Sequence, residues 1–526
     1  MFESFKALFV VGVLSFGAFA YARIAFSEIV PAATLNRWRN LYLAVTVIAF
    51  LTPNYWLMLF VLAGVTLIFG AGEKFKPALY LLLIFAVPAA SRVVPGFGGI
   101  NNFLELYPFN VLAIVLLFPL LFRPDDLKGA RGGRITDLAF TGYTLLYILL
   151  AFRDTTFTDG IRQSASFILT AIPQYLVFSR IRWTVEKLRL ATAALVIPLL
   201  ALSGVAAAEV VLSWHLYNGA VETWGVDTTL RYVERSGFLR AYGSIFGPIA
   251  FGLFLLVGLA LAPALAMGMT KRRLAYFSIP ALGAGLLATF SRGPWIGGAL
   301  AFTAYIATTR RSLSNLMRLT VAGIAGLVVL SVSPFGDTII NLLPFIGDVE
   351  ENTIDYRQRL FEVGMEVAMR NPFFGSENYL ETDAMQSLLQ GQGIIDIVNT
   401  YLRIALDSGF VGLGLYAGAM VFALLAALGA IRPARAVSAE LAAYCQGYFA
   451  ALLGVSVVLA TTSNNIAQVQ EVTWVLCGMC IGVARAVSLE RKGAPAVIEN
   501  TEVPEPREAP APTRPLPPHL KQYARR

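Results

Sequence analysis

Long apolar runs recur almost without pause along this chain, separated by short polar connections. Backbone inside a bilayer must satisfy its own hydrogen bonds, so each run of sufficient length predicts a transmembrane helix. The pattern predicts an all-α fold, a polytopic transmembrane helix bundle of about a dozen or more helices, and the two short runs flanking Pro53 leave the count open by one. The runs cover residues 6–23, 40–52, 54–72, 77–93, 104–122, 135–152, 164–180, 188–212, 241–267, 274–290, 294–309, 316–333, 409–430, 441–462 and 471–487.

Composition agrees with a membrane protein. The 526 residues are 57% hydrophobic and only 14% charged, with a mean hydropathy of +0.66. The net charge of +8 is spread over short loops rather than one patch, so nucleic acid is not an expected partner. The three cysteines lie in or beside apolar runs without zinc-like spacing, and we expect no metal site and no disulfide from them. The first run, Ala7 to Ala22, lacks a strong basic flank and a cleavage site, and we expect it to be a retained helix.

Basic residues mark alternate loops and thereby orient the predicted bundle. Cytoplasmic loops carry an excess of lysine and arginine, so these loops and the tail after Arg485 are expected in the cytoplasm of a bacterium, with the chain in its inner membrane. The marking residues are Arg37, Arg39, Lys74, Lys76, Arg123, Lys128, Arg131, Arg134, Arg180, Arg182, Lys187, Arg189, Lys271, Arg272, Arg273, Arg310, Arg311, Arg318, Arg432 and Arg435.

Two polar gaps fall on the opposite, periplasmic face, at about 213–240 and at 334–407. The longer gap is rich in aspartate and glutamate and holds four arginines but no lysine. Within it, Asp355 to Arg370 predicts an amphipathic helix that Asn371-Pro372 ends. Its apolar side comprises Leu360, Phe361, Val363, Val367 and Ala368.

The domain prediction follows from these gaps. We expect a transmembrane bundle at 1–333, a helical periplasmic loop domain at 334–407 and further transmembrane helices at 408–488. The proline-rich segment 489–526 cannot build a core and is expected to be a disordered cytoplasmic tail.

Candidate chemistry lies in arginines on the periplasmic side, since no P-loop, dinucleotide or zinc-protease motif occurs. Arg292, in the sequence Thr289 to Trp295, is expected at the periplasmic boundary of the membrane. A charge there is energetically costly unless an anion pairs with it. Snorkelling to lipid headgroups, or pairing with a loop acid, is the alternative for Arg292. Arginines from separate loops that converged would form a pyrophosphate clamp, whereas solvated charges paired with neighbouring acids are the simpler interpretation of each. These arginines are Arg231, Arg235, Arg240, Arg357 and Arg359.

Several short motifs occur in a fixed order in the second half of the chain. They are Arg235-Ser-Gly237, Ser291-Arg292-Gly293, Tyr356-Arg357-Gln-Arg359-Leu360, Asn371-Pro-Phe-Phe-Gly375, Asn399-Thr-Tyr401-Leu402 and Leu406-Asp-Ser-Gly-Phe-Val-Gly-Leu413. Together they resemble the O-antigen ligase and polymerase superfamily. The resemblance implies a GT-C-like glycosyltransferase whose donor is a glycan on undecaprenyl pyrophosphate, acting at the periplasmic face without a metal or another cofactor. It also implies that Arg235, Arg292, Arg357 and Arg359 hold the pyrophosphate, with Arg292 a catalytic residue as well.

One departure from the family concerns the general base. Ligases of this family carry a histidine directly before the asparagine of the Asn-x-Tyr-Leu stretch, and here that position is Val398. Asp396 is the best remaining catalytic candidate for a base, with Glu377 and Glu381 behind it, although a solvated loop charge is the alternative for each. Candidates for binding the acceptor or supporting the site are His215, which lies beside Trp214, together with Asn399 and Tyr401.

These features favour a polymerase that joins lipid-linked repeat units into a surface polysaccharide or exopolysaccharide. The alternative within the same chemistry is an O-antigen ligase, which moves finished glycan to lipid A–core or another acceptor. A transporter or flippase would need ionisable residues deep within several spans, yet Arg92 and Arg153 lie near span ends. A scaffold in an export complex is a further possibility. Expected partners are the lipid-linked donor, membrane lipids and a chain-length regulator or export complex.

Overall fold

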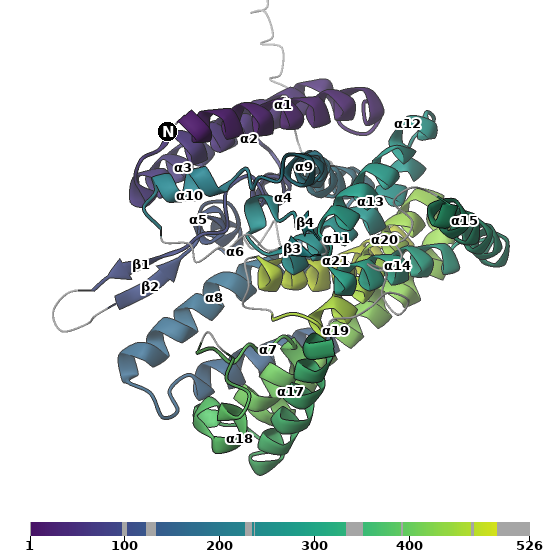
Figure 1. Cartoon of the computed structure of the whole chain (residues 1–526). Helices are drawn as coiled ribbons and strands as arrows, with labels where there is room; N and C mark the ends of the chain where they lie inside the picture. The colour runs from purple at the N-terminus through teal and green to yellow at the C-terminus, as the bar shows by residue number, and fades with distance from the viewer. Residues whose placement is uncertain are drawn as a thin grey trace, which may run out of the picture.

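The computed structural model describes residues 2–96, 102–122, 133–226, 234–235, 237–332, 351–390, 393–463 and 468–491 (Figure 1). Arg231 and most of the predicted tail lie outside these residues. Most of the described residues are helical, which confirms the predicted all-α bundle. The principal helices are α1 (Phe2–Ala25), α2 (Ala32–Leu51), α3 (Tyr55–Gly70), α4 (Lys76–Leu83), α7 (Arg134–Leu150), α8 (Phe157–Arg180), α9 (Val185–Leu212), α11 (Pro248–Met267), α13 (Ser278–Ala288), α14 (Arg292–Ala307), α15 (Ser312–Val332), α17 (Glu351–Arg370), α19 (Thr400–Val437), α20 (Ala439–Leu459) and α21 (Val469–Arg491).

Short elements complete the described chain. Two antiparallel hairpins, β1 (Arg92–Pro95) with β2 (Asn102–Leu106) and β3 (Glu234–Arg235) with β4 (Phe238–Leu239), are its only strands. The short helical elements are α5 (Pro108–Leu112), η1 (Ala113–Leu117), α6 (Phe118–Leu121), α10 (Asn218–Thr223), η2 (Gly243–Ile245), α12 (Arg272–Tyr276), η3 (Asn378–Glu381) and α18 (Asp383–Gln386).

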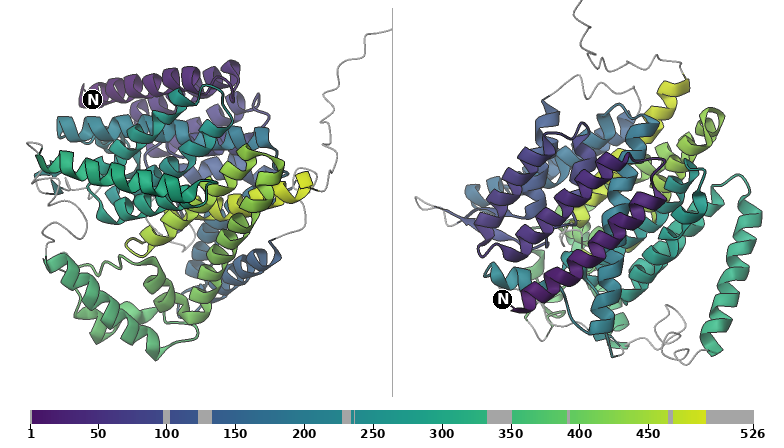
Figure 2. Two further views of the ribbon diagram at one scale, coloured as in Figure 1. Left: turned by 90° about the vertical axis from the view of Figure 1, so that its right-hand side faces the viewer. Right: turned by 90° about the horizontal axis from the view of Figure 1, so that it is seen from above.

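Six described helices are long and apolar enough to cross a membrane, which makes the chain a multi-pass membrane protein. They are α1, α9, α11, α19, α20 and α21. Helices α9, α11, α20 and α21 are largely buried within the protein, whereas α1 and α19 leave much of their apolar surface outward. The remaining predicted runs also form helices, most of them shorter or less apolar, packed around this centre (Figure 2).

Contacts between loops establish the two ends of the bundle. At the end predicted to be cytoplasmic, Arg37 donates to the carbonyl of Gly72 at 2.7 Å, and Arg189 pairs with Glu440 at 2.6 Å. At the other end the Ser4 hydroxyl donates to the carbonyl of Gly219 at 3.2 Å. The start of α1 therefore lies at the end predicted to be periplasmic, a side that the loop charges alone had left open.

Three predicted spans are wrong at their ends. The run 77–93 is helical only to Leu83, and the run 104–122 begins with a strand, because the intervening chain forms the β1–β2 hairpin. Val93-Val94-Pro95 favours extended backbone, and Pro108 begins a helix rather than continuing one. The run 241–267 likewise becomes helical only at Pro248, since Gly243 and Phe246 both take positive φ before it.

Helices α17 and α18, with η3 between them, form a separate helical layer against α7 and α19 (Figures 1 and 2). Helix α17 ends at Arg370, as Asn371-Pro372 predicts. Leu360, Val367 and Ala368 are buried in a hydrophobic cluster with residues of η3, α18 and the first turns of α19. Phe361, which the pattern also places on the apolar side of this helix, is 51% exposed.

Candidate active site

The β3–β4 hairpin lies on the turn that precedes α14. The backbone N–H of Ala241 donates to Ala288 at 3.0 Å, and the rings of Phe238 and Phe290 stack with centroids 5.3 Å apart. Arg235 donates to the carbonyl of Phe290 at 3.2 Å, and Arg240 donates to the Ser291 hydroxyl at 2.8 Å. The Arg235-Ser-Gly237 motif and the Ser291-Arg292-Gly293 motif, which lie in different loops of the sequence, therefore form one local structure.

This turn presents Arg292 as the first residue of α14. Phe290 has a φ of 45°, an unfavourable conformation for an aromatic residue, which its packing against Phe238 and the hydrogen bond from Arg235 stabilise. Arg292 itself is half-buried. At Gly293 a Cβ would come within 2.3 Å of the Thr461 hydroxyl, so the glycine of this motif permits close contact with the end of α20.

The residues that follow α20 also fix the start of α19. Both the backbone N–H and the hydroxyl of Thr400 donate to the carbonyl of Thr462, at 2.9 and 2.7 Å. Arg403 donates to the Ser463 hydroxyl at 3.2 Å. Thr461 to Ser463 thus joins the α14 start, which carries Arg292, to the α19 start, which carries Arg403.

Asn399 and Tyr401 support this arrangement through the backbone. The Asn399 side chain caps α19 by accepting from the N–H groups of Tyr401 and Leu402, at 3.0 and 3.1 Å. The Tyr401 hydroxyl donates to the carbonyl of Ser456 at 2.7 Å. Both side chains are engaged in holding helices, which accounts for their spacing in the motif.

Arg357, on α17, is brought close to Arg235 of the hairpin. Partial burial lowers the pKa of the Arg357 guanidinium, the nearby positive charge of Arg235 lowers it further, and Asp396 opposes the change. Two cations from separate loops held near each other repel unless an anion lies between them. The pair therefore has the electrostatic character of an anion-binding site.

Asp396 lies beside these cations. The Tyr356 hydroxyl donates to the Asp396 carbonyl and accepts from the Asp396 N–H, both at 3.1 Å, so α17 positions the loop that carries this acid. The residue is exposed, yet the protein around its carboxyl group raises the pKa of Asp396, while Arg357 and Arg403 act against the rise. An accessible carboxylate of raised pKa is suited to accept a proton.

Arg359 does not join this group. Two residues along a helix correspond to a rotation of about 200°. Arg357 is half-buried and Arg359 is exposed, as this geometry requires. The structure brings Arg235 and Arg357 together and leaves Arg359 on another side of α17.

Glu377 lines a cavity of about 330 Å³ between α7, α8, the loop domain and α19. Arg153, Arg403, Asp407 and Tyr379 also line it. Burial raises the pKa of Glu377, while a hydrogen bond from Gln163 and the charge of Arg153 oppose the rise. Because Arg403 contributes to this cavity and also acts electrostatically on Asp396, the cavity adjoins the arginine group.

Arg153 fixes the loop domain onto α19. Its guanidinium donates to the carbonyls of Phe374, Gly375 and Asp407, at 2.7, 3.1 and 3.0 Å. The Asn371–Gly375 motif packs backbone against backbone on the kink of α19 at Gly409. Arg153, the Asn371–Gly375 motif and the Leu406–Leu413 motif thus hold in place the helical layer that carries Arg357.

His215 is placed in the protein core. It is fully buried, its ring stacks on Tyr242 with centroids 3.6 Å apart, and its Nδ1 is 3.6 Å from a carboxylate oxygen of Glu209. Glu209 also accepts from the backbone N–H groups of Leu216, Tyr242 and Gly243. This packing supports the segment that leads from the β3–β4 hairpin into α11, behind the arginines.

Sequence reasoning gave no role to Arg403 or Tyr356. Arg403 lies four residues after the Asn399 cap, one turn into α19 on the same helix face, and this spacing was a signal for its position. Tyr356 directly precedes Arg357 in the motif already noted, but its contact with Asp396 joins residues forty positions apart and has no local signature.

A comparison with known protein families finds a match in the part of the chain that carries the candidate site. Residues 277–417 match the family model described as O-antigen ligase. The matched segment includes Arg292, α17, Asp396 and the Asn399 cap, and it confirms the predicted resemblance to the O-antigen ligase and polymerase superfamily. No curated protein matches the chain.

Proposed function

We propose that this chain, part of which matches the O-antigen ligase family model, is a glycosyltransferase of the O-antigen ligase and polymerase superfamily that polymerises lipid-linked oligosaccharide repeat units. Proteins of this family act on lipid-linked glycans as ligases or polymerases. In our proposal the donor is a glycan on undecaprenyl pyrophosphate, the membrane is the bacterial inner membrane, and the reaction occurs at its periplasmic face.

The observation that carries the proposal is the electrostatic coupling of Arg357 with Arg235, which is hydrogen-bonded to the turn before α14. They come from different loops, Arg357 is partly buried, and the carboxylate of Asp396 lies close enough to act on it. A diphosphate between these guanidiniums would relieve their repulsion and accept charge-assisted hydrogen bonds. Arg292 begins α14 two residues after Phe290, whose carbonyl accepts a hydrogen bond from Arg235. In our proposal Arg292 supplies a third cation.

The proposed reaction uses these groups as follows. An acceptor hydroxyl of one repeat unit attacks the anomeric carbon of another, forming a new C–O bond while the bond from that carbon to the pyrophosphate oxygen breaks. Undecaprenyl pyrophosphate leaves with the bonding electron pair, and the arginines stabilise its developing charge. The hydroxyl proton passes to the Asp396 carboxylate. The Glu377 cavity would hold sugar rings, its volume being at the lower end of the usual range for ligand sites, about 300–1,000 Å³.

Ligation of finished glycan remains the alternative within this chemistry, because donor and arginines would be the same. Val398 in place of the family's histidine favours polymerisation. The transport alternative receives little support from the described helices. The buried acids of these helices, Glu209 and Glu471, lie in the last turn of α9 and the first turn of α21. A proton or ion pathway would instead require ionisable groups near the middle of the bilayer.

A deletion strain complemented with wild-type or Arg292→Ala protein tests the proposal. We expect Arg292→Ala at normal protein level to give no polymer, with single repeat units accumulating on the lipid carrier. Long carrier-linked chains that are not delivered would identify a ligase instead. Normal polymer from the Arg292→Ala strain would exclude the proposed enzymatic role.

A further inference from the structure

A cavity of about 1020 Å³ lies at the end of the bundle opposite to the arginine site. Its lining comes from the C-terminal ends of α11, α14 and α19 and from the starts of α15 and α20. Helix α14 begins with Arg292 and has 16 residues, which corresponds to a length of about 24 Å. The cavity is therefore separate from the candidate active site and lies on the face that the loop charges predict to be cytoplasmic.

Five arginines line this cavity, and no aspartate or glutamate does. They are Arg272, Arg310, Arg311, Arg432 and Arg435. Within the described part of the chain, none of the five forms an ion pair with a carboxylate. Such a concentration of uncompensated positive charge attracts anions and repels cations.

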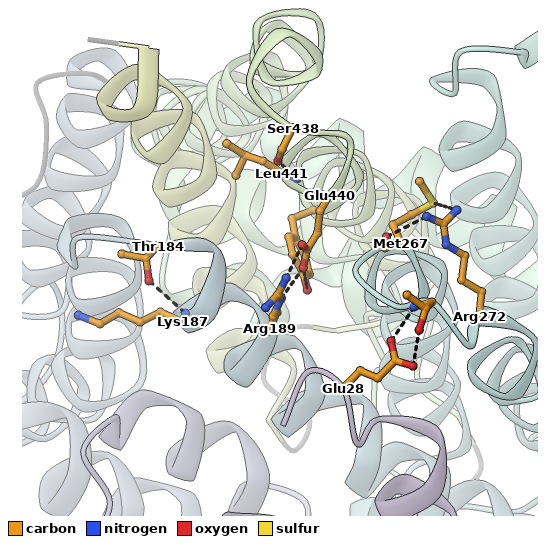
Figure 3. Close-up of polar contacts among 11 residues, drawn as sticks. Glu28, Thr184, Lys187, Arg189, Met267, Arg272, Ser438, Glu440 and Leu441 are labelled. Carbon is orange, nitrogen blue, oxygen red and sulfur yellow. Dashed lines mark hydrogen bonds and ion pairs between the residues drawn. The ribbon is translucent and has the colours of Figure 1, made fainter. Parts of the chain in front are cut away.

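Neighbouring acids are already engaged elsewhere. Figure 3 shows Glu440 bonded to Arg189, at 2.6 and 2.7 Å, and Glu28 bonded to the loop at Thr270. It also shows Arg272 folded back onto Met267, where its guanidinium donates to the backbone carbonyl at 3.3 Å. The nearby carboxylates thus hold helices together and leave the charge of the cavity arginines unbalanced.

Much of the remaining lining is apolar. Pro263, Phe302 and Ile306 contribute to the cavity from the last turns of α11 and α14, and the polar side chains of Thr309, Asn315 and Gln446 also line it. Tyr276, which also lines it, is 40% exposed, in keeping with an aromatic side chain at a membrane boundary. A ligand that fits both parts has an anionic head and a hydrocarbon tail.

We propose that this cavity binds an anionic phospholipid of the cytoplasmic leaflet. The arginines contact the phosphate of the headgroup, and an acyl chain lies along Phe302 and Ile306. Basic pockets between helices at this face are a recognised means of binding anionic lipid headgroups. A free phosphate would satisfy the arginines but would leave the apolar lining without a partner.

Native mass spectrometry of the full chain in detergent tests the proposal with phosphatidylglycerol and phosphatidylcholine of identical acyl chains. We expect phosphatidylglycerol to bind at least about tenfold more tightly. The double variant Arg310→Gln/Arg432→Gln should weaken that binding about thirtyfold, because each arginine near the headgroup contributes substantially. The matched control Arg273→Gln/Arg318→Gln removes the same charge from exposed positions outside the cavity and should change binding less than twofold.

A second variant tests the proposal independently, in case the double variant misfolds. Ala436→Phe fills part of the cavity from an exposed position without changing charge, and it should also weaken phosphatidylglycerol binding. Equal binding of the two lipids, or equal loss in both charge-removing variants, would overturn the proposal. Displacement of phosphatidylglycerol by an equal concentration of inorganic phosphate would show that the cavity is a simple anion site and would overturn it too.

Discussion

Arginines gather at both ends of this bundle, but the two groups are held very differently. At the candidate active site, Arg235, Arg240 and Arg403 each donate to a backbone carbonyl or hydroxyl of a fixed turn. At the opposite end the five arginines of the cavity are all exposed. Arg272 and Arg435 donate to backbone carbonyls, whereas the described contacts include no such hydrogen bond from Arg310, Arg311 and Arg432. Only the first group has an acid of raised pKa, Asp396, beside it.

This difference indicates different tasks for the same residue type. Stabilising charge that develops during a reaction requires donors already fixed in place, since reorientation at that moment costs free energy. Holding a lipid headgroup requires only a favourable average potential, which exposed side chains supply. The contrast predicts that variants at the first site lose activity steeply and depend on the position of the side chain.

The largest expected effect follows from Asp396→Asn. If Asp396 is the general base, removing it should lower polymer formation by about 10²- to 10⁴-fold. Because the base must be deprotonated, wild-type activity should fall as pH decreases through the pKa of Asp396, which burial places above the ordinary aspartate value of about 3.9. Polymer formed by reconstituted protein, measured across pH, checks both points.

A matched control for this variant is Asp383→Asn, an exposed acid in the same layer. It should retain both the activity and the acid limb of the pH profile. Arg357 opposes the raised pKa of Asp396, so Arg357→Gln should move the acid limb to higher pH. An unchanged acid limb in Asp396→Asn would assign the proton to another group, and Glu377 would then be the next residue to replace.

The second prediction compares two arginines of one helix. Arg357→Ala should lower activity about 10²- to 10³-fold, the usual cost of removing one donor to a developing charge. Arg359→Ala should change activity less than threefold, because this side chain is exposed on another side of α17. Arg357→Lys should recover activity only in part, since an ammonium group cannot donate in the two-pronged geometry of a guanidinium. Equal losses at Arg357 and Arg359 would contradict the placement of the site.

The fold was largely predictable because its strongest signal is long-range hydropathy. The apolar runs predicted the helices, and the amphipathic pattern predicted α17 with its proline stop. The β1–β2 hairpin was missed because apolar, β-branched residues such as Val93 and Val94 continue a run of hydropathy without being helical. Hydropathy reports burial in lipid or protein and does not by itself distinguish strand from helix.

The candidate site was predictable in its residue types but only partly in its geometry. Sequence placed Arg235, Arg292 and Arg357 on one face, and the structure brings Arg235 and Arg357 together. It could not separate Arg357 from Arg359, because the rotation of α17 depends on how Leu360 and Val367 pack. Nor could it find the buried position of His215, which contacts across the fold determine.

The smallest expected effect concerns Gly409, whose kink in α19 holds the layer that carries Arg357. Gly409 has φ 67° and ψ −173°, a conformation almost restricted to glycine, and its Cβ would lie 2.3 Å from the backbone of Phe373. Gly409→Ala should therefore lower the free energy of unfolding by about 1–3 kcal/mol, measured by thermal unfolding in detergent.

Gly414→Ala provides the control within the same helix, because no atom lies within 4 Å of its added Cβ and stability should change by less than about 1 kcal/mol. The kink allows Phe410 and Val411 to donate to the carbonyls of Pro372 and Phe373, at 2.7 and 3.3 Å. Straightening it would displace the loop layer and with it Arg357, so Gly409→Ala should lose more activity than its loss of stability explains. If both glycine variants polymerised equally well, the position of this layer would not matter, and the contrast between the two groups of arginines would lose its functional meaning.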